Sequence, residues 1–235
     1  MITTIGFDAD DTLWHNEVFF RLTQDRFAAL LADYVAPDVL HDRLLAVEQR
    51  NLGIYGYGVK GFTLSMIETA LDITKGAVSG RVIAELMAAG REMLAHPIDL
   101  LPYAHRVVAE LAQTHRIILI TKGDLLDQER KLAQSGLGDF FHGVEIVSDK
   151  TAQVYDGIFT RHGARVDQSM MVGNSLKSDV LPVIAAGGWG VHIPHDLTWA
   201  LEHAPEPTGN PRFRRLPDLG QLSDLVEKIA NGHHI

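Results

Sequence analysis

The segment Ile2-Thr3-Thr4-Ile5-Gly6-Phe7 is a short apolar run that stops at the acidic segment Asp8-Ala9-Asp10-Asp11-Thr12. A run of this length that carries β-branched residues and ends abruptly is typical of a buried strand. This part of the chain therefore predicts a buried first strand with carboxylates directly after its last residue.

Four later apolar runs are similar to the first one. They are Arg116–Ile120, which ends at Thr121; Val144–Val147, which ends before Ser148-Asp149-Lys150; Met170–Val172, which ends at Gly173-Asn174; and Trp189–Ile193, which ends at Pro194. Between them, apolar residues recur at helical spacing over residues 103–111, 125–132 and 180–184. This alternation predicts a doubly wound α/β core of the Rossmann-like kind, a parallel sheet with helices on both faces. The later segment Pro205–Pro217 is expected on the surface, and a last helix is expected over Leu219–Ile229.

More than 100 residues separate the first predicted strand from the second. Within this interval, residues 16–96 show apolar stripes at helical spacing, which predict a helical subdomain inserted after the first strand. The α/β core then comprises residues 1–15 and 97–235. The segment Leu52–Phe62 carries four glycines in eleven residues, so we expect a loop there between helices of the insertion.

The composition of the 235 residues is that of a folded globular protein, with 46% hydrophobic and 22% charged residues. A chain of this length is expected to form one large domain, or two domains with one embedded in the other. Acidic residues exceed basic residues by 30 to 21, which gives a net charge of −9. That charge disfavours a nucleic-acid partner but allows a small anion in a local basic pocket.

Several classes of site and location are also disfavoured. The chain contains no cysteine, which rules out disulfides, zinc–thiolate sites, iron–sulfur clusters and cysteine nucleophiles. No apolar run approaches the roughly 18 residues of a membrane helix, so no membrane partner is expected. The first residues lack the basic start of a secretory signal and soon reach Asp8, so a cytoplasmic location is expected.

Polar side chains follow the predicted strands at the edge where an open parallel sheet carries its functional site. They are three carboxylates, one amide, one hydroxyl and one ammonium: Asp8, Asp10, Asp179, Asn174, Thr121 and Lys150. Carboxylates gathered at one place repel one another unless they surround a divalent cation with oxygen ligands, most naturally Mg²⁺. A hydroxyl and an ammonium beside that cation make a site for phosphoryl oxygens.

These residues form four motifs that resemble those of the haloacid dehalogenase-like hydrolases. The motifs are Asp8-Ala9-Asp10-Asp11-Thr12 (Asp-x-Asp-x-Thr), Thr121 at a strand end, Lys150 before Thr151-Ala152-Gln153, and Gly173-Asn174-Ser175-Leu176-Lys177-Ser178-Asp179 (usually Gly-Asp-x-x-x-x-Asp). All four occur in order, and the helical insertion over residues 16–96 looks like the helical cap of that family. The resemblance implies a catalytic α/β core, a cap that covers it, and hydrolase activity.

The resemblance also implies a role for each motif residue. Asp8 is expected to be the nucleophile that takes the phosphoryl group and becomes an aspartyl phosphate. Asp10 is expected to protonate the leaving oxygen and then to activate water. Thr121 is expected to hydrogen-bond a phosphoryl oxygen, and Lys150 to neutralise the nucleophile and the phosphate. The expected Mg²⁺ ligands are Asp8, the backbone carbonyl of Asp10, and the pair Asn174 and Asp179.

Some positions depart from the family's usual pattern. Asn174 stands where aspartate is usual, so we expect either weaker metal binding or a direct ligand role for Asp179. Lys122 stands where asparagine is frequent, and it either adds positive charge near the phosphate or points to solvent. Asp11 stands where glycine is frequent, and no chemistry is assigned to it.

In the insertion, Lys60 lies in the glycine-rich segment and is a candidate for contact with an anionic part of the substrate.

The leading interpretation is a Mg²⁺-dependent phosphatase whose partner is a small phosphate ester. The resemblance also admits a 2-haloacid dehalogenase, which uses an aspartate nucleophile but needs neither Mg²⁺ nor the second aspartate of the first motif. Asp10 therefore favours phosphoryl transfer. A phosphonatase or a phosphomutase shares the motifs and stays open. A non-catalytic binding module is suggested only by Asn174 and is disfavoured by the other three motifs.

Overall fold

The structure, a computed structural model, describes residues 1–231. Residues 1–231 divide into two compact units, one formed by residues 1–15, 98–122 and 128–231, the other by residues 16–97 and 123–127. We expected residues 123–127 in the α/β core, but the structure groups this short segment with the inserted helices.

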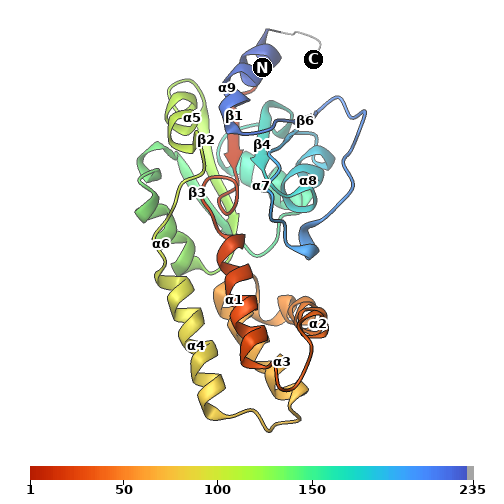
Figure 1. The fold of residues 1–235 in the computed structure, drawn as a ribbon. Coiled ribbons are helices and arrows are strands. Elements are labelled where there is room, and N and C mark those ends of the chain that lie inside the picture. Colours follow the sequence, from red (N-terminus) through yellow and green to blue (C-terminus); the bar gives the residue numbers. More distant parts are fainter. Residues whose placement is uncertain (232–235) are drawn as a thin grey trace. The chain divides into compact units, whose positions relative to one another are not determined.

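The first unit is built on a sheet of six parallel strands (Figure 1). The strands are β1 (Thr4–Phe7), β2 (Arg116–Lys122), β3 (Gly143–Val147), β4 (Ser169–Gly173), β5 (Trp189–His192) and β6 (Phe213–Arg215). Their spatial order is β3-β2-β1-β4-β5-β6, and neighbouring strands run parallel throughout. The predicted doubly wound α/β core is thus confirmed. In such sheets ligands bind beyond the carboxyl ends of the strands, where the strand order reverses, here at β1 and β4.

Hydrophobic clusters cover both faces of this sheet. Ile5, Phe7 and their neighbours on one face pack with residues of α5 (Ala104–Leu111), α6 (Leu125–Ser135) and α9 (Leu222–Ala230). On the other face, Ile118, Ile120 and Met171 pack with residues of α7 (Ala152–Arg161) and α8 (Leu181–Ala185). Successive residues of a strand point to opposite faces, so a strand covered on both faces is apolar along its whole length.

The sixth strand lies within Pro205–Pro217, a segment that is mostly exposed or half-buried as expected but in which no strand is predicted from the sequence. Within that segment β6 adds to the edge of the sheet, where Gly190 pairs with Phe213 and His192 with Arg215. The strand has three residues, two of them arginines, so it carries no apolar run that marks it in the sequence.

The second unit contains four helices over residues 16–97: α1 (Glu17–Leu30), α2 (Pro37–Tyr55), α3 (Val59–Ile73) and α4 (Gly80–Ala95). They bury an apolar cluster of their own, which includes Phe27, Leu44, Met66 and Leu86. Local signals mark two helix starts. A proline opens α2, and the hydroxyl of Ser79 accepts a hydrogen bond from the backbone of Val82 at the start of α4. None of the helices within residues 1–231 combines the length and the apolar character that crossing a bilayer requires.

The glycine-rich segment Leu52–Phe62 is mostly helical, contrary to the loop that we expected. Only residues 56–58 separate α2 from α3. Gly56 and Gly58 have φ angles of 73° and 111°, which glycine adopts readily. At Gly61, inside α3, a Cβ atom would lie 2.9 Å from the carbonyl oxygen of Gly56. The glycines therefore form a tight connection between two helices, and a helical glycine costs only about 1 kcal/mol relative to alanine.

Candidate active site

The structure brings most of the predicted site residues to the carboxyl edge of the sheet. Asp8 follows β1 directly, Thr121 and Lys122 end β2, Lys150 follows β3, and Asn174 follows β4. Because parallel strands end at the same edge, Asp8 and Lys150 are neighbours although 142 positions separate them in the chain.

Lys150 joins two of the carboxylates. Its Nζ donates to Asp8 Oδ1 at 2.6 Å and to Asp179 Oδ1 at 2.7 Å. The side chains of Lys150 and Asp179 are each 1% exposed. The other Asp179 oxygen accepts a hydrogen bond from the backbone N–H of Ser175 at 3.0 Å. Both oxygens of Asp179 are thus engaged, and its position beside β4 requires Gly173, where a Cβ atom would collide with Asp179 Oδ2.

Burial and charge shift the pKa values of these groups. The pKa of Asp8 is raised to about 7, because burial and then the charge of Asp179 raise it by more than Lys150 lowers it. Burial alone lowers the pKa of Lys150, but Asp179 and Asp8 outweigh it, so the pKa is raised and the ammonium stays charged. Two carboxylates share one ammonium, which leaves this buried cluster with an excess of negative charge that a cation would stabilise.

Thr12 connects Asp8 with Asn174. Its Oγ1 donates to Asp8 Oδ2 at 2.9 Å, lies 3.3 Å from Asn174 Oδ1, and accepts the backbone N–H of Asn174 at 3.0 Å. The Thr12 hydroxyl therefore brings one oxygen of Asp8 and the amide oxygen of Asn174 to the same place. Thr12 belongs to the first motif, but its place in the sequence does not indicate this bridging role.

Asp10 is held by three donors. Trp14 Nε1 and Lys131 Nζ donate to Oδ1 at 2.7 and 2.9 Å, and Gln128 Nε2 donates to Oδ2 at 2.8 Å. Gln128 and Lys131 lie three positions apart on α6 and are both buried, at 3% and 7% exposure. Sequence reasoning missed both residues. The available signal was a pair of polar residues on the helix face that also carries Leu132.

The residues at the end of β2 are placed differently from each other. The Thr121 side chain is buried at the site edge, and its hydroxyl donates to the Lys122 carbonyl at 3.3 Å. The Lys122 ammonium donates to Ser178 Oγ at 2.8 Å and to Glu202 Oε1 at 2.7 Å. Lys122 therefore does not point to solvent, which was one of its two expected positions.

Lys60 belongs to the second unit and lies in the first turn of α3, not in a loop. Its Nζ is 3.4 Å from Asp124 Oδ1, and its side chain is 55% exposed. Its backbone N–H also donates to Asp124 Oδ2 at 3.3 Å. The contact of Lys60 with substrate stays a prediction.

The backbone conformation at Asp11 explains why glycine is frequent at this position in the family. Asp11 has a φ of 59°, in the left-handed region that glycine adopts without strain. Aspartate is among the few other residues that tolerate this conformation. The Asp11 N–H donates to the Trp14 carbonyl at 2.8 Å, so the position closes a tight turn after Asp8.

The oxygen atoms available as ligands at this edge fit a hard cation of the Mg²⁺ type. Within residues 1–231 no cluster of three or more His, Cys, Asp or Glu side chains is arranged to hold a metal. A cation here would therefore use one carboxylate, Asp8, together with neutral oxygens from the Asn174 amide and the Asp10 backbone. Asp179 accepts from Lys150 and from the Ser175 N–H, so it positions Lys150. Both Asp8 oxygens are engaged in the same way, so these partners do not decide against Asp179 as a ligand, and its direct role stays a prediction. Oxygen-only ligands suit Mg²⁺, and the excess negative charge suits a cation.

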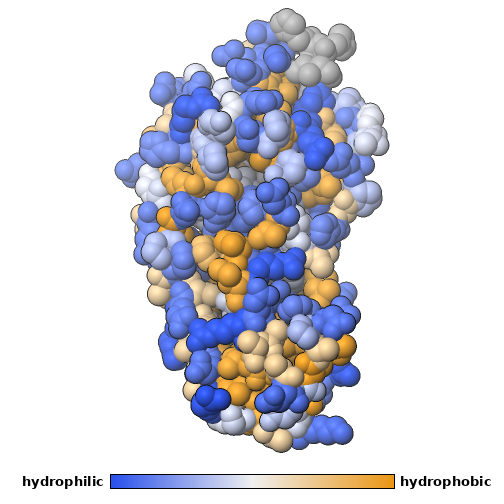
Figure 2. Space-filling model, in the orientation of Figure 1, coloured by the Kyte–Doolittle hydropathy of each residue, from blue (hydrophilic) through white to orange (hydrophobic). Residues whose placement is uncertain are grey.

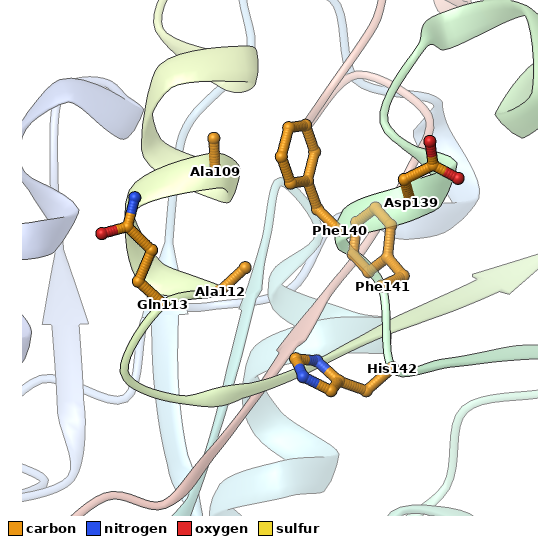
Figure 3. A pocket seen from close by; sticks show the side chains of 7 residues that line it. All are labelled: Ala109, Ala112, Gln113, Asp139, Phe140, Phe141 and His142. Atoms are coloured by element: carbon orange, nitrogen blue, oxygen red, sulfur yellow. The ribbon is translucent and has the colours of Figure 1, made fainter.

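A cavity of about 350 Å³ lies elsewhere in the first unit (Figure 3). Ala109, Ala112, Gln113, Asp139, Phe140, Phe141 and His142 line it. His142 is hydrogen-bonded to Ile117 near the start of β2, so this cavity belongs to the amino end of the strand and holds none of the predicted site residues.

Comparison with known proteins agrees with this arrangement. Residues 2–187 match the haloacid dehalogenase-like hydrolase family. The crystal structure of a haloacid dehalogenase-like family hydrolase from Xanthomonas campestris is 40% identical, covering 98% of this chain and 93% of that chain, with a TM-score of 0.88. The glyceraldehyde 3-phosphate phosphatase of Methanothermobacter thermautotrophicus is 24% identical, covering 96% of this chain and all of that protein. The L-2-haloacid dehalogenase from Xanthobacter autotrophicus with chloropropionic acid covalently bound is 18% identical, covering 97% of this chain and 99% of that chain, with a TM-score of 0.64. The chain therefore belongs to the haloacid dehalogenase-like hydrolases and is a hydrolase.

Proposed function

We propose that this hydrolase is a Mg²⁺-dependent phosphatase that cleaves a small phosphomonoester through an aspartyl phosphate on Asp8. The observation that carries the proposal is the second carboxylate of the first motif. Asp10 stands two residues after the nucleophile, and Trp14, Gln128 and Lys131 hold both of its oxygens. A nucleophile accompanied by a fixed second carboxylate suits a reaction that needs an acid in one step and a base in the next.

The proposed reaction has two balanced steps. An Asp8 oxygen attacks phosphorus, the bond from phosphorus to the ester oxygen breaks, and that oxygen takes a proton from Asp10. A water molecule then gives a proton to Asp10 and attacks phosphorus, and the bond from phosphorus to the Asp8 oxygen breaks. Asp8 is regenerated and inorganic phosphate leaves. Lys150 and the Thr121 hydroxyl bind the phosphoryl oxygens, which carry negative charge in both steps.

In this proposal Asp8, Asn174 and the backbone carbonyl of Asp10 hold Mg²⁺. When bound, the ion neutralises the phosphoryl group and the nucleophile, which otherwise repel each other. Asp179 keeps Lys150 in place beside Asp8. Because Asn174 contributes a neutral oxygen where the family usually has a carboxylate, we expect the ion to be held weakly.

Asn174→Asp is expected to lower the Mg²⁺ concentration that gives half-maximal activity by roughly tenfold, because each added ligand charge tightens a site of this kind. It need not raise kcat, since the new charge also repels a phosphate dianion. The measurement is activity against Mg²⁺ concentration. Asn210→Asp adds the same charge at a residue whose side chain accepts the backbone N–H of Arg212 and that belongs to none of the four motifs, and it serves as the control. An unchanged half-saturation point in Asn174→Asp would show that Asn174 is not a ligand.

The second candidate is a 2-haloacid dehalogenase, in which Asp8 would attack carbon and halide would leave. The neutral Asn174 favours it, because a reaction without Mg²⁺ needs no further charge there. The three donors that hold Asp10 argue against a dehalogenase, since a dehalogenase of this superfamily does not need this second carboxylate. A phosphonatase or a phosphomutase would use the same four motifs, and substrate tests distinguish these activities from that of a phosphatase.

The test compares two substrates with and without Mg²⁺. A phosphatase releases phosphate from a generic aryl phosphate in the presence of Mg²⁺, and it releases no halide from 2-chloropropionate. A dehalogenase gives the reverse and ignores Mg²⁺. A screen of phosphate esters follows, beginning with three-carbon phosphoesters because the phosphatase relative is named for glyceraldehyde 3-phosphate. No phosphate release from any ester would overturn the proposal.

A further inference from the structure

A carboxylate that none of the four motifs contains lies beside the site. Glu202 belongs to the short turn Ala200–Glu202 in the connection between β5 and β6, beyond residue 187, where the family match ends. Its side chain is 15% exposed, and its Oε1 accepts a hydrogen bond from Lys122 Nζ at 2.7 Å. Its Oε2 accepts hydrogen bonds from the hydroxyls of Ser175 and Ser178, each at 2.5 Å.

The donors to Glu202 come from both sides of β1. Lys122 ends β2, whereas Ser175 and Ser178 belong to the turn that follows β4. In the sheet, β1 with the nucleophile at its end lies between β2 and β4. Lys122 Nζ also donates to Ser178 Oγ at 2.8 Å, which closes the set of four polar groups. Glu202 therefore links the two strand ends that flank Asp8.

The turn that Glu202 holds is also the turn that positions Asp179. Within it, the Ser175 hydroxyl accepts the backbone N–H of Ser178 at 2.9 Å, and the Ser175 N–H donates to Asp179. Asp179 in turn binds Lys150, and Lys150 binds Asp8. A continuous path of hydrogen bonds thus leads from Glu202 to the nucleophile.

The largely buried ion pair of Lys122 and Glu202 has hydrogen-bond partners for both of its charged groups. Burial raises the pKa of Glu202, but the Lys122 charge and the hydrogen bonds from Lys122, Ser175 and Ser178 outweigh it, so the pKa is lowered. Removing one partner of a buried ion pair leaves an uncompensated charge, whereas removing both is often close to neutral. This difference makes the role of the pair measurable.

We infer that Glu202 is a positioning residue for the nucleophile, and that Lys122 serves this pair instead of binding the phosphoryl group. The inference rests on the proposed phosphatase function. With Glu202 in place, the turn after β4 holds Asp179 and Lys150 where Asp8 needs them. Lys122 supplies the charge that keeps Glu202 there.

The test uses Glu202→Gln, Lys122→Met and the double variant, assayed with an aryl phosphate at saturating Mg²⁺. Each single variant is expected to lower kcat by about 10- to 100-fold while KM changes little, because a small displacement at a reacting centre is enough for such a loss. The double variant buries no unpaired charge and is expected to recover most of the lost kcat. Glu145→Gln is the matched control, since Glu145 is 19% exposed and forms ion pairs with Arg161 at 2.7 Å and with His162 at 2.8 Å, neither of which is a site residue.

Three results would overturn the inference. The first is a Glu202→Gln variant with the kcat of Glu145→Gln. The second is a Lys122→Met variant whose KM rises and whose defect the double variant does not relieve, as expected if Lys122 binds substrate. The third is a loss of Tm in the double variant that equals the sum of the losses in the two single variants, because residues that interact as a pair give non-additive effects.

The experiment separates this inference from the proposed function. If Glu202→Gln fails to fold, the double variant decides, because it is expected to fold and to be active. If the wild-type protein releases no phosphate, the proposed function fails, and the Tm values of the four proteins still show whether the two side chains act as a pair.

Discussion

Asp8→Asn is expected to abolish phosphate release while the protein stays folded. Asparagine has nearly the shape of aspartate but offers no anionic oxygen to attack phosphorus. Loss of the nucleophile in a covalent mechanism lowers kcat by on the order of 10⁴-fold or more. Lys150 keeps Asp179 as a partner in the variant, so no buried ammonium is left without a carboxylate. The measurement is turnover of an aryl phosphate, with circular dichroism and Tm to show the fold.

The control for this variant is the same substitution at an exposed position. Asp156 lies on the exposed side of α7, and Asp156→Asn is expected to retain full activity. Phosphatase activity that persists in pure, folded Asp8→Asn would refute the assignment of the nucleophile.

Asp10→Asn is expected to lower kcat by about 10²- to 10⁴-fold, the usual contribution of a general acid or base. The asparagine oxygen still accepts from Trp14 and Lys131, but the side chain neither gives nor takes a proton. An alkyl phosphate should lose more than an aryl phosphate in the first step, because its leaving oxygen needs the proton more. With the aryl ester, the phosphorylated enzyme should accumulate, since the second step has lost its base.

Asp11→Asn is the neighbouring control, because asparagine also tolerates the left-handed backbone of that position. It should behave as the wild type. An Asp10→Asn enzyme as fast as wild type on an alkyl phosphate would remove Asp10 from the mechanism.

Much of the fold could be predicted because buried parallel strands are apolar along their whole length. Runs such as Arg116–Ile120 and Met170–Val172 therefore marked β2 and β4 directly. The prediction failed at β6, where two of three residues are arginines and the edge position relaxes the demand for apolar side chains. It also failed at Leu52–Phe62, where the glycine content predicts a loop but most residues are helical. Two of those glycines lie inside α2 and α3, where packing of the helices offsets their cost.

The candidate site also contains residues that could be predicted from the sequence and residues that could not. Residues directly after strands could be predicted to meet, since topology alone brings Asp8 and Lys150 together. The partners that hold them could not, because no local pattern connects Asp10 with Lys131, 121 positions away. Glu202 lies in an irregular segment, and only the folded sheet brings it to Lys122.

The most direct test of the mechanism is to ask what becomes attached to Asp8. Wild-type protein and Asp10→Asn are mixed with an aryl phosphate and Mg²⁺, quenched in acid during turnover, digested and examined by mass spectrometry. The mechanism predicts a phosphoryl group on the peptide that contains Asp8, in greater amount in Asp10→Asn and absent without Mg²⁺. A phosphoryl group on another residue, or a peptide that stays unmodified with the phosphate ester but carries the carbon skeleton of 2-chloropropionate after incubation with that acid, would contradict it.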